Sequence, residues 1–303
     1  MKTSFKNRIL WIIGVVFVWY ILILSILEEI FGNILSQIFP NQSEGMAFVN
    51  YLYLPTIVPL VGLIVFLMLT PMRNGHVLEA MKYGSQNNNM KTLGLGILIG
   101  FIMNFSCILI ALLHGDIFLK FNFTIAQLPF YIWAFLWVFV QSTSEEVWCR
   151  GFMYERINVH YPLWVAIIVN GSIFGLLHIF NPGVGVLPIV DIIICGISFS
   201  LLRWYTGSIW CAMGVHTMWN FTQNFLFGLP NSGLVSKASV FVLDAAVYKP
   251  GLLYDIDFGV EGAIPAVIAD FLLGAVCLYL GYRSGRLGEL KACKEDDPNF
   301  PRI

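Results

Sequence analysis

Long apolar stretches, separated by short polar breaks, run through the whole chain. A helix that crosses a bilayer needs about 20 predominantly apolar residues. The stretches that approach this length are Ile9–Leu27, Val49–Leu69, Leu93–Leu113, Leu128–Val140 with a continuation to about Arg156, Leu163–Phe180, Leu187–Leu202, Ile209–Phe227 and Ala263–Tyr282. The pattern predicts an all-α polytopic membrane protein with about eight transmembrane helices.

The composition agrees with this assignment. Hydrophobic residues make up 58% of the 303 residues and charged residues 12%, with a mean hydropathy of +0.77. Soluble domains carry about 25% charged residues, so a soluble enzyme, a disordered protein and a nucleic-acid binder are excluded. The net charge of −1 gives no global attraction for polyanions.

The distribution of Lys and Arg predicts the orientation, because cytoplasmic loops are enriched in these residues. Basic residues precede the first stretch and follow the last, whereas residues 228–262 are rich in Asp and Glu. Charge alternates through eight crossings and predicts that both termini are cytoplasmic. No small-residue cleavage site follows the first stretch, which is therefore expected to remain as an anchor. A bacterial plasma membrane is the expected location.

The chain shows no internal repeat and no second domain. We therefore expect one integral membrane domain over residues 1–303, with a catalytic core at 128–225 and an outer loop or cap at 228–262. Six scattered cysteines form no CxxC pair and are interpreted as thiols rather than as disulfides or a zinc site.

The first polar interruption of an apolar stretch is residues 141–150, Gln-Ser-Thr-Ser-Glu-Glu-Val-Trp-Cys-Arg. Glu145 and Glu146 lie about 100° apart on a helix, and Glu146 is spaced to pair with Arg150. That leaves Glu145 free to point elsewhere. Alternatively, these charges are the solvated cytoplasmic end of a span.

Two further interruptions contain histidines. Phe174-Gly-Leu-Leu-His178 ends one apolar stretch, and His216-Thr-Met-Trp-Asn220 lies in the middle of another. A lone His is often a satisfied core residue, and a His and an Asn on one helix face can simply hold helices together. Asp191 and Asp270 also lie in apolar stretches, where an interfacial position or a polar neighbour is the simpler explanation.

The expected depths of these side chains in the membrane agree. At 1.5 Å per residue from the cytoplasmic ends, Glu145 and Asn220 lie about 20 Å deep, His178 about 25 Å and His216 about 14 Å. We therefore expect one intramembrane cavity. There a carboxylate and an imidazole can deprotonate a water, while a second His and an amide stabilise an oxyanion.

The three elements resemble the signature of the CAAX-processing and bacteriocin-processing family of intramembrane proteases, called CPBP or Abi proteins, whose motifs are EExxxR, FxxxH and HxxxN. The resemblance covers about residues 128–225. By motif position, it implies that Glu145 is the general base and His178 its partner in activating water. It implies that His216 and Asn220 stabilise the oxyanion, with Glu146, Arg150 and Phe174 in support.

The resemblance leaves metal dependence open. Glu145, His178 and His216 could hold a catalytic zinc ion, but the chain has no HExxH motif. We favour a mechanism that requires no cofactor, with a divalent metal such as zinc as the alternative.

The expected function is intramembrane hydrolysis of membrane-associated peptides or proteins, such as CAAX-type tails or leader and pheromone peptides. The lipid bilayer is the surrounding partner, and access is expected laterally or from the cytoplasm. A non-proteolytic bacteriocin-immunity protein or regulatory scaffold is the alternative. A transporter with a proton relay is less favoured, because the inverted repeats common in transporters are missing from the sequence.

Overall fold

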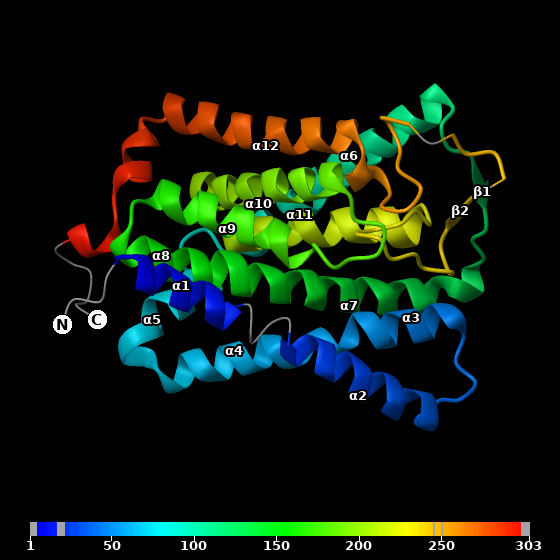
Figure 1. Ribbon diagram of the computed structural model, residues 1–303, viewed down its shortest axis with the longest axis horizontal. Helices are drawn as coiled ribbons and strands as arrows, with labels where there is room; N and C mark the ends of the chain where they lie inside the picture. The colour runs from blue at the N-terminus through cyan, green and yellow to red at the C-terminus, as the bar shows by residue number, and fades with distance from the viewer. Residues whose placement is uncertain (1–4, 17–21, 245, 250, 298–303) are drawn as a thin grey trace.

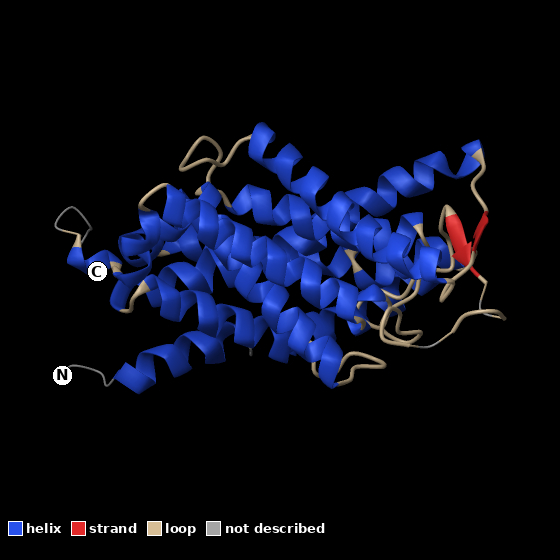
Figure 2. Cartoon of the chain, turned by 90° about the horizontal axis from the view of Figure 1, so that it is seen from above, coloured by secondary structure: helices blue, strands red, loops and turns tan. Residues whose placement is uncertain are grey.

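A computed structural model shows a bundle of long helices that run roughly side by side along one axis (Figure 1). It describes residues 5–16, 22–244, 246–249 and 251–297. The helices are α1 (Phe5–Val16), α2 (Ile23–Ile38), α3 (Glu44–Leu52), α4 (Ile57–Leu69), α5 (Pro71–Met81), α6 (Met90–His114), α7 (Leu128–Glu146), α8 (Tyr154–His160), α9 (Leu163–Leu177), α10 (Val186–Thr206), α11 (Ile209–Phe221) and α12 (Ile264–Arg283). Helix predominates throughout (Figure 2), which confirms the predicted helical polytopic fold.

Within the described residues, five helical segments are long and apolar enough to cross a membrane. They are Glu44–Leu69, Met90–His114, Ile125–His160, Val186–Thr206 and Ile264–Arg283. α9 is a shorter apolar helix, and α11 continues into a π-helical turn, η5 (Thr222–Leu226). The first predicted span, Ile9–Leu27, includes residues 17–21, which lie outside the described residues.

The span predicted at Leu163–Phe180 is too long at its C-terminal end. α9 ends at Leu177, and His178 is its C-cap, with φ −96° and ψ 3°. The Asn181-Pro182-Gly183 turn follows, and Gly183 adopts a positive φ of 71°. The apolar residues Ile179 and Phe180 therefore follow the end of the helix, in the turn that reverses the chain.

Close packing between helices fixes the position of α11 at the centre of the bundle. A Cβ atom at Gly96 on α6 would clash with the Cys211 carbonyl on α11, and one at Gly214 would clash with the α6 backbone. Small residues let membrane helices approach closely. Together these glycines hold α11 against α6, and α11 also packs against α7.

α7 does not end at its polar residues. It continues through the π-helical segment η4 (Val147–Met153) into α8, so that one rod extends to His160. π-helical turns inside α-helices often occur at functional sites. Here the segment carries Cys149 and Arg150 into the buried interior.

The described residues of the segment 228–262 lie at one end of the bundle and are called the cap below (Figure 1). Its short strand β2 (Phe241–Leu243) pairs antiparallel with β1 (Leu119–Phe121), with Leu119 opposite Leu243. The cap ends in the 3₁₀ turn η6 (Val260–Gly262), which leads into α12.

Candidate active site

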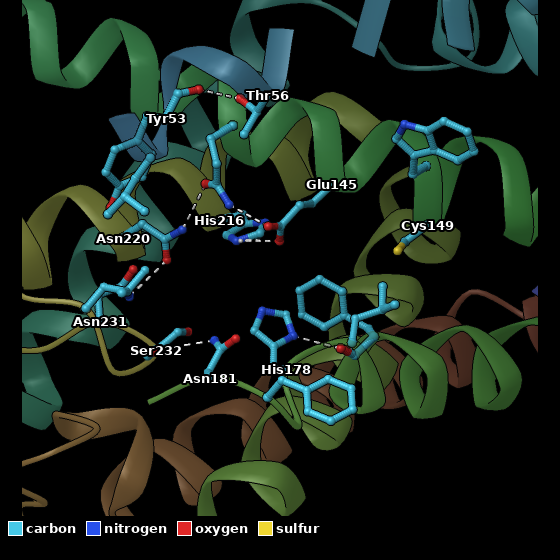
Figure 3. Close-up of a pocket in the computed structure, with 17 residues that line it drawn as sticks. Tyr53, Thr56, Glu145, Cys149, His178, Asn181, His216, Asn220, Asn231 and Ser232 are labelled. Atoms are coloured by element: carbon cyan, nitrogen blue, oxygen red, sulfur yellow. Dashed lines mark hydrogen bonds and ion pairs between the residues drawn. The ribbon is translucent and has the colours of Figure 1, made fainter. Parts of the chain in front are cut away.

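Glu145, His178, His216 and Asn220, the four residues predicted to carry the chemistry, line one cavity of about 370 Å³. They come from α7, the end of α9 and α11. Figure 3 shows Glu145 beside His216 and Asn220, with His178 on the opposite wall. Packing of these three helices thus brings together residues that are far apart in the sequence.

Glu145 is positioned by neighbours on two helices. One turn earlier on α7, the Gln141 amide donates to its Oε1 at 2.5 Å. The Nε2 atom of His216 lies 3.6 Å from its Oε2, which is buried and has no hydrogen-bond partner. A carboxylate oxygen held in this way has a lone pair available for another group in the cavity.

Glu146 faces away from the cavity and anchors the site. Its Oε1 accepts from Arg150 at 2.9 Å and from the Nδ1 atom of His216 at 3.0 Å. The Glu146 and Arg150 side chains are both 0% exposed. Because a carboxylate can only accept, this contact assigns the proton to Nδ1 of His216 and leaves Nε2 facing Glu145.

Arg150 connects all three motifs. Its guanidinium lies 4.1 Å from the centre of the Phe174 ring and also donates to the Gly196 carbonyl at 3.2 Å. Phe174 packs edge-on against His178 and His216. The conspicuous aromatic residue of the second motif therefore packs between the guanidinium and both imidazoles.

His178 is oriented by its own helix. Its Nδ1 atom lies 2.8 Å from the Phe174 carbonyl oxygen, four residues earlier, so the ring donates that proton to the backbone. This contact leaves Nε2 of His178 free to act as an acceptor. The structure pairs Glu145 with His216 rather than with His178, which instead lies across the cavity.

A chain of amides connects Asn220 to the cap. Its Nδ2 donates to Gln141 at 3.4 Å, and its Oδ1 accepts from Asn231 at 3.2 Å. Asn231 in turn donates to Glu261 at 2.9 Å. The sequence does not predict three members of this chain as site residues: Gln141, Asn231 and Glu261. Asn231 and Glu261 lie in the outer segment, where polar residues are common and give no signal. Gln141 lies one turn before Glu145, within the polar patch of α7.

Glu261 anchors this chain from η6, outside the spans. It accepts from Trp219 at 2.8 Å and from the Ser232 backbone amide at 2.7 Å. Burial, the largest effect, raises the pKa of its carboxyl, while the hydrogen bonds from Ser232 and Trp219 oppose that rise. A buried carboxyl is tolerated here because several donors satisfy it.

A second cavity of about 30 Å³ lies behind the histidines. Asp191 and Asp270 line it and are 1% and 2% exposed, so both carboxyl groups are buried inside the bundle. Each has one buried oxygen without a hydrogen-bond partner. The space is enough for about one water molecule.

The three candidate zinc ligands do not converge. Within the described residues, no three His, Cys, Asp or Glu side chains form a group that could hold a metal ion. Glu145 and His216 are close, and His178 stands on the other wall. A zinc site would therefore require movement of His178.

Comparison with known families adds an independent result. Residues 127–222 match the family described as type II CAAX prenyl endopeptidase Rce1-like. This stretch contains all three motifs and confirms the resemblance inferred from them. No curated protein matches the chain.

Proposed function

We propose that this chain, whose central third matches the Rce1-like type II CAAX prenyl endopeptidase family, is an intramembrane endopeptidase. Its substrates are membrane-associated peptides or proteins, and Glu145 activates the attacking water. One observation carries the proposal: the Glu145 carboxylate lies in a cavity beside two histidines and an asparagine, in a bundle of membrane-spanning helices. Ionisable residues inside membranes are costly and mark functional sites.

In the proposed mechanism, Glu145 takes a proton from a water molecule while His178 accepts a hydrogen bond from the same water. The water oxygen attacks the peptide carbonyl carbon, and the carbonyl oxygen becomes an oxyanion. His216 and Asn220 donate to that oxyanion. The C–N bond then breaks, and Glu145 returns its proton to the leaving amine.

The surroundings of His216 support its part in this mechanism. Its ring lies between two carboxylates, with Nε2 3.6 Å from Glu145 and Nδ1 3.0 Å from Glu146. Donation to the oxyanion comes from Nε2, so the proposed mechanism requires a proton on Nε2 in addition to the one on Nδ1. Glu146 and Arg150 hold it there from the buried side.

The test compares peptide termini in membranes and medium from cells that carry the wild-type protein or Glu145→Gln at matched expression. Termini found only with the wild type establish a protease and identify its substrate. Identical termini at good coverage would contradict the proposal and favour a scaffold or immunity role.

Metal dependence is tested separately with the purified protein and a peptide that contains the identified cleavage site. Activity that persists in chelator supports the metal-free mechanism. Loss of activity that zinc restores would replace it with one in which Glu145, His178 and His216 bind the metal.

A further inference from the structure

The two ends of the helix bundle differ in the segments they carry. At one end, here called the terminal end, lie the described parts of the chain nearest the termini and the connections 82–89, 161–162, 207–208 and 284–297. At the other, the cap end, lie the connections 39–43, 115–127 and 178–185 and the described residues of 228–263. Figure 1 shows these ends at the left and right.

The catalytic cavity extends from the middle of the bundle toward the cap end. Beyond the motif residues, its wall includes Asn181 after α9 and Asn231, Ser232 and Leu234 of the cap. None of the described terminal-end connections contributes a lining residue. The cavity therefore extends toward the cap end, where the 178–185 turn and the cap form part of its wall.

Part of the cavity wall is also exposed on the outside of the bundle. Phe180 lines the cavity, yet its side chain is 81% exposed, and its neighbour Ile179 is 46% exposed. Exposed apolar side chains of this kind suit contact with lipid. A peptide anchored in the same bilayer could reach the cavity here without leaving the membrane surface.

Positive charge is distributed unequally between the two ends. Of the 17 Lys and Arg residues, the cap-end connections carry Lys120, Lys237 and Lys249. Ion pairs engage two of these, Lys120 with Asp244 at 2.7 Å and Lys237 with Glu44 at 3.5 Å. Basic residues at or near the terminal end are Lys82, Lys91, Arg203, Arg283, Arg286, Lys291 and Lys294.

From these two observations we infer that the catalytic cavity opens on the extracytoplasmic face of the membrane. The enrichment of Lys and Arg places the terminal end in the cytoplasm, and the cavity reaches the opposite end. Resting on the proposed function, the inference also specifies the substrate class. Substrates are membrane-anchored peptides whose cleaved segment lies outside the cytoplasm, such as exported leader or pheromone peptides, rather than lipidated tails exposed to the cytoplasm.

The chemistry of the cavity wall fits an internal peptide segment. The wall combines neutral amides with apolar side chains, including Leu52, Leu177 and Leu234. No Lys or Arg is among its lining residues in the described chain. The free carboxylate of a chain end would therefore find no Lys or Arg there, whereas an extended uncharged segment could donate to and accept from the amides.

Labelling of single cysteines in intact cells tests the sidedness. In a Cys293→Ser background, Lys237→Cys places a thiol at the cap end and Lys291→Cys places one at the terminal end, and both replace exposed lysines. A membrane-impermeant maleimide should label Lys237→Cys equally in intact and permeabilised cells. It should label Lys291→Cys only after permeabilisation, while the background variant measures labelling of the remaining cysteines.

The reverse labelling pattern would overturn the inference. Because labelling requires no catalysis, this result is independent of whether the protein is a protease. The substrate class is tested by mapping the termini that depend on Glu145 onto the topology of their parent proteins. Termini in extracytoplasmic segments support the proposed substrate class. Termini confined to cytoplasmic segments overturn that substrate class, even when the labelling is as expected.

Discussion

Two buried carboxylates on one continuous rod, Glu146 and Glu155, show how a site for chemistry differs from a structural ion pair. Each pairs with an arginine that stacks on an aromatic ring: Arg150 lies 4.1 Å from the Phe174 ring, and Arg203 lies 4.3 Å from the Tyr154 ring. Their exposed fractions are 0% and 2%. By residue type, aromatic stacking and burial the two are close equivalents.

They differ in how completely their oxygens are used. Arg203 contacts one oxygen of Glu155 and Lys294 contacts the other, so both are paired. Glu146 concentrates two contacts on Oε1 and leaves Oε2 unpartnered, and Glu145 beside it also has an unpartnered oxygen. Buried polar groups are normally satisfied, so unsatisfied ones mark places where another molecule is expected to bind.

The largest expected effect separates the two regions by activity. Glu145→Gln removes the proposed base and should lower the cleavage rate about 10²- to 10⁴-fold, because a positioned general base contributes that much. Glu155→Gln should leave the rate per folded molecule unchanged. Both are measured on purified protein with the identified peptide; a Glu145→Gln protein with wild-type activity would rule out the mechanism.

Removal of each arginine separates the regions by stability. Arg150→Ala leaves Glu146 with only His216 and should cost about 3–5 kcal/mol, as expected for breaking a buried pair. Arg203→Ala should cost less, since Lys294 still contacts Glu155. Unfolding in detergent at increasing denaturant measures both, and an equal loss would show that the second cation does not compensate.

Asn220→Ala tests the wall of the cavity. As an oxyanion donor, Asn220 should contribute about 2.7–4 kcal/mol to the rate, or 10²- to 10³-fold in kcat. KM should change little, because the interaction forms in the transition state. A change confined to KM would instead assign Asn220 to substrate binding.

Asn231→Ala should have the smallest effect, since Asn231 contacts Asn220 and Glu261 without belonging to a motif. We expect about a tenfold loss of kcat, equivalent to 1.4 kcal/mol. Asn224→Ala is the matched control, because the Asn224 side chain also donates to the cap, to the Leu229 and Leu234 carbonyls, but makes no hydrogen bond to the Asn220 side chain. Equal effects of the two substitutions would indicate a general loosening of the cap.

The sequence by itself determined the membrane class and the helical fold, because helices in lipid satisfy their own backbone groups and require long apolar stretches. It also identified Glu145, His178, His216 and Asn220 as candidates, since polar residues stand out in such stretches. The spacing of four was enough to predict the Glu146–Arg150 contact, which depends only on helix geometry.

Only the tertiary structure decided which histidine lies beside Glu145 and which residues support Asn220. The choice of His216 over His178 depends on where α9 ends and how closely α11 approaches α7, neither of which is a local property of the chain. Asn231 and Glu261 join the site through a cap that folds back over the bundle. Contacts of this kind depend on packing between distant segments, whereas apolar periodicity reports only what each helix does alone.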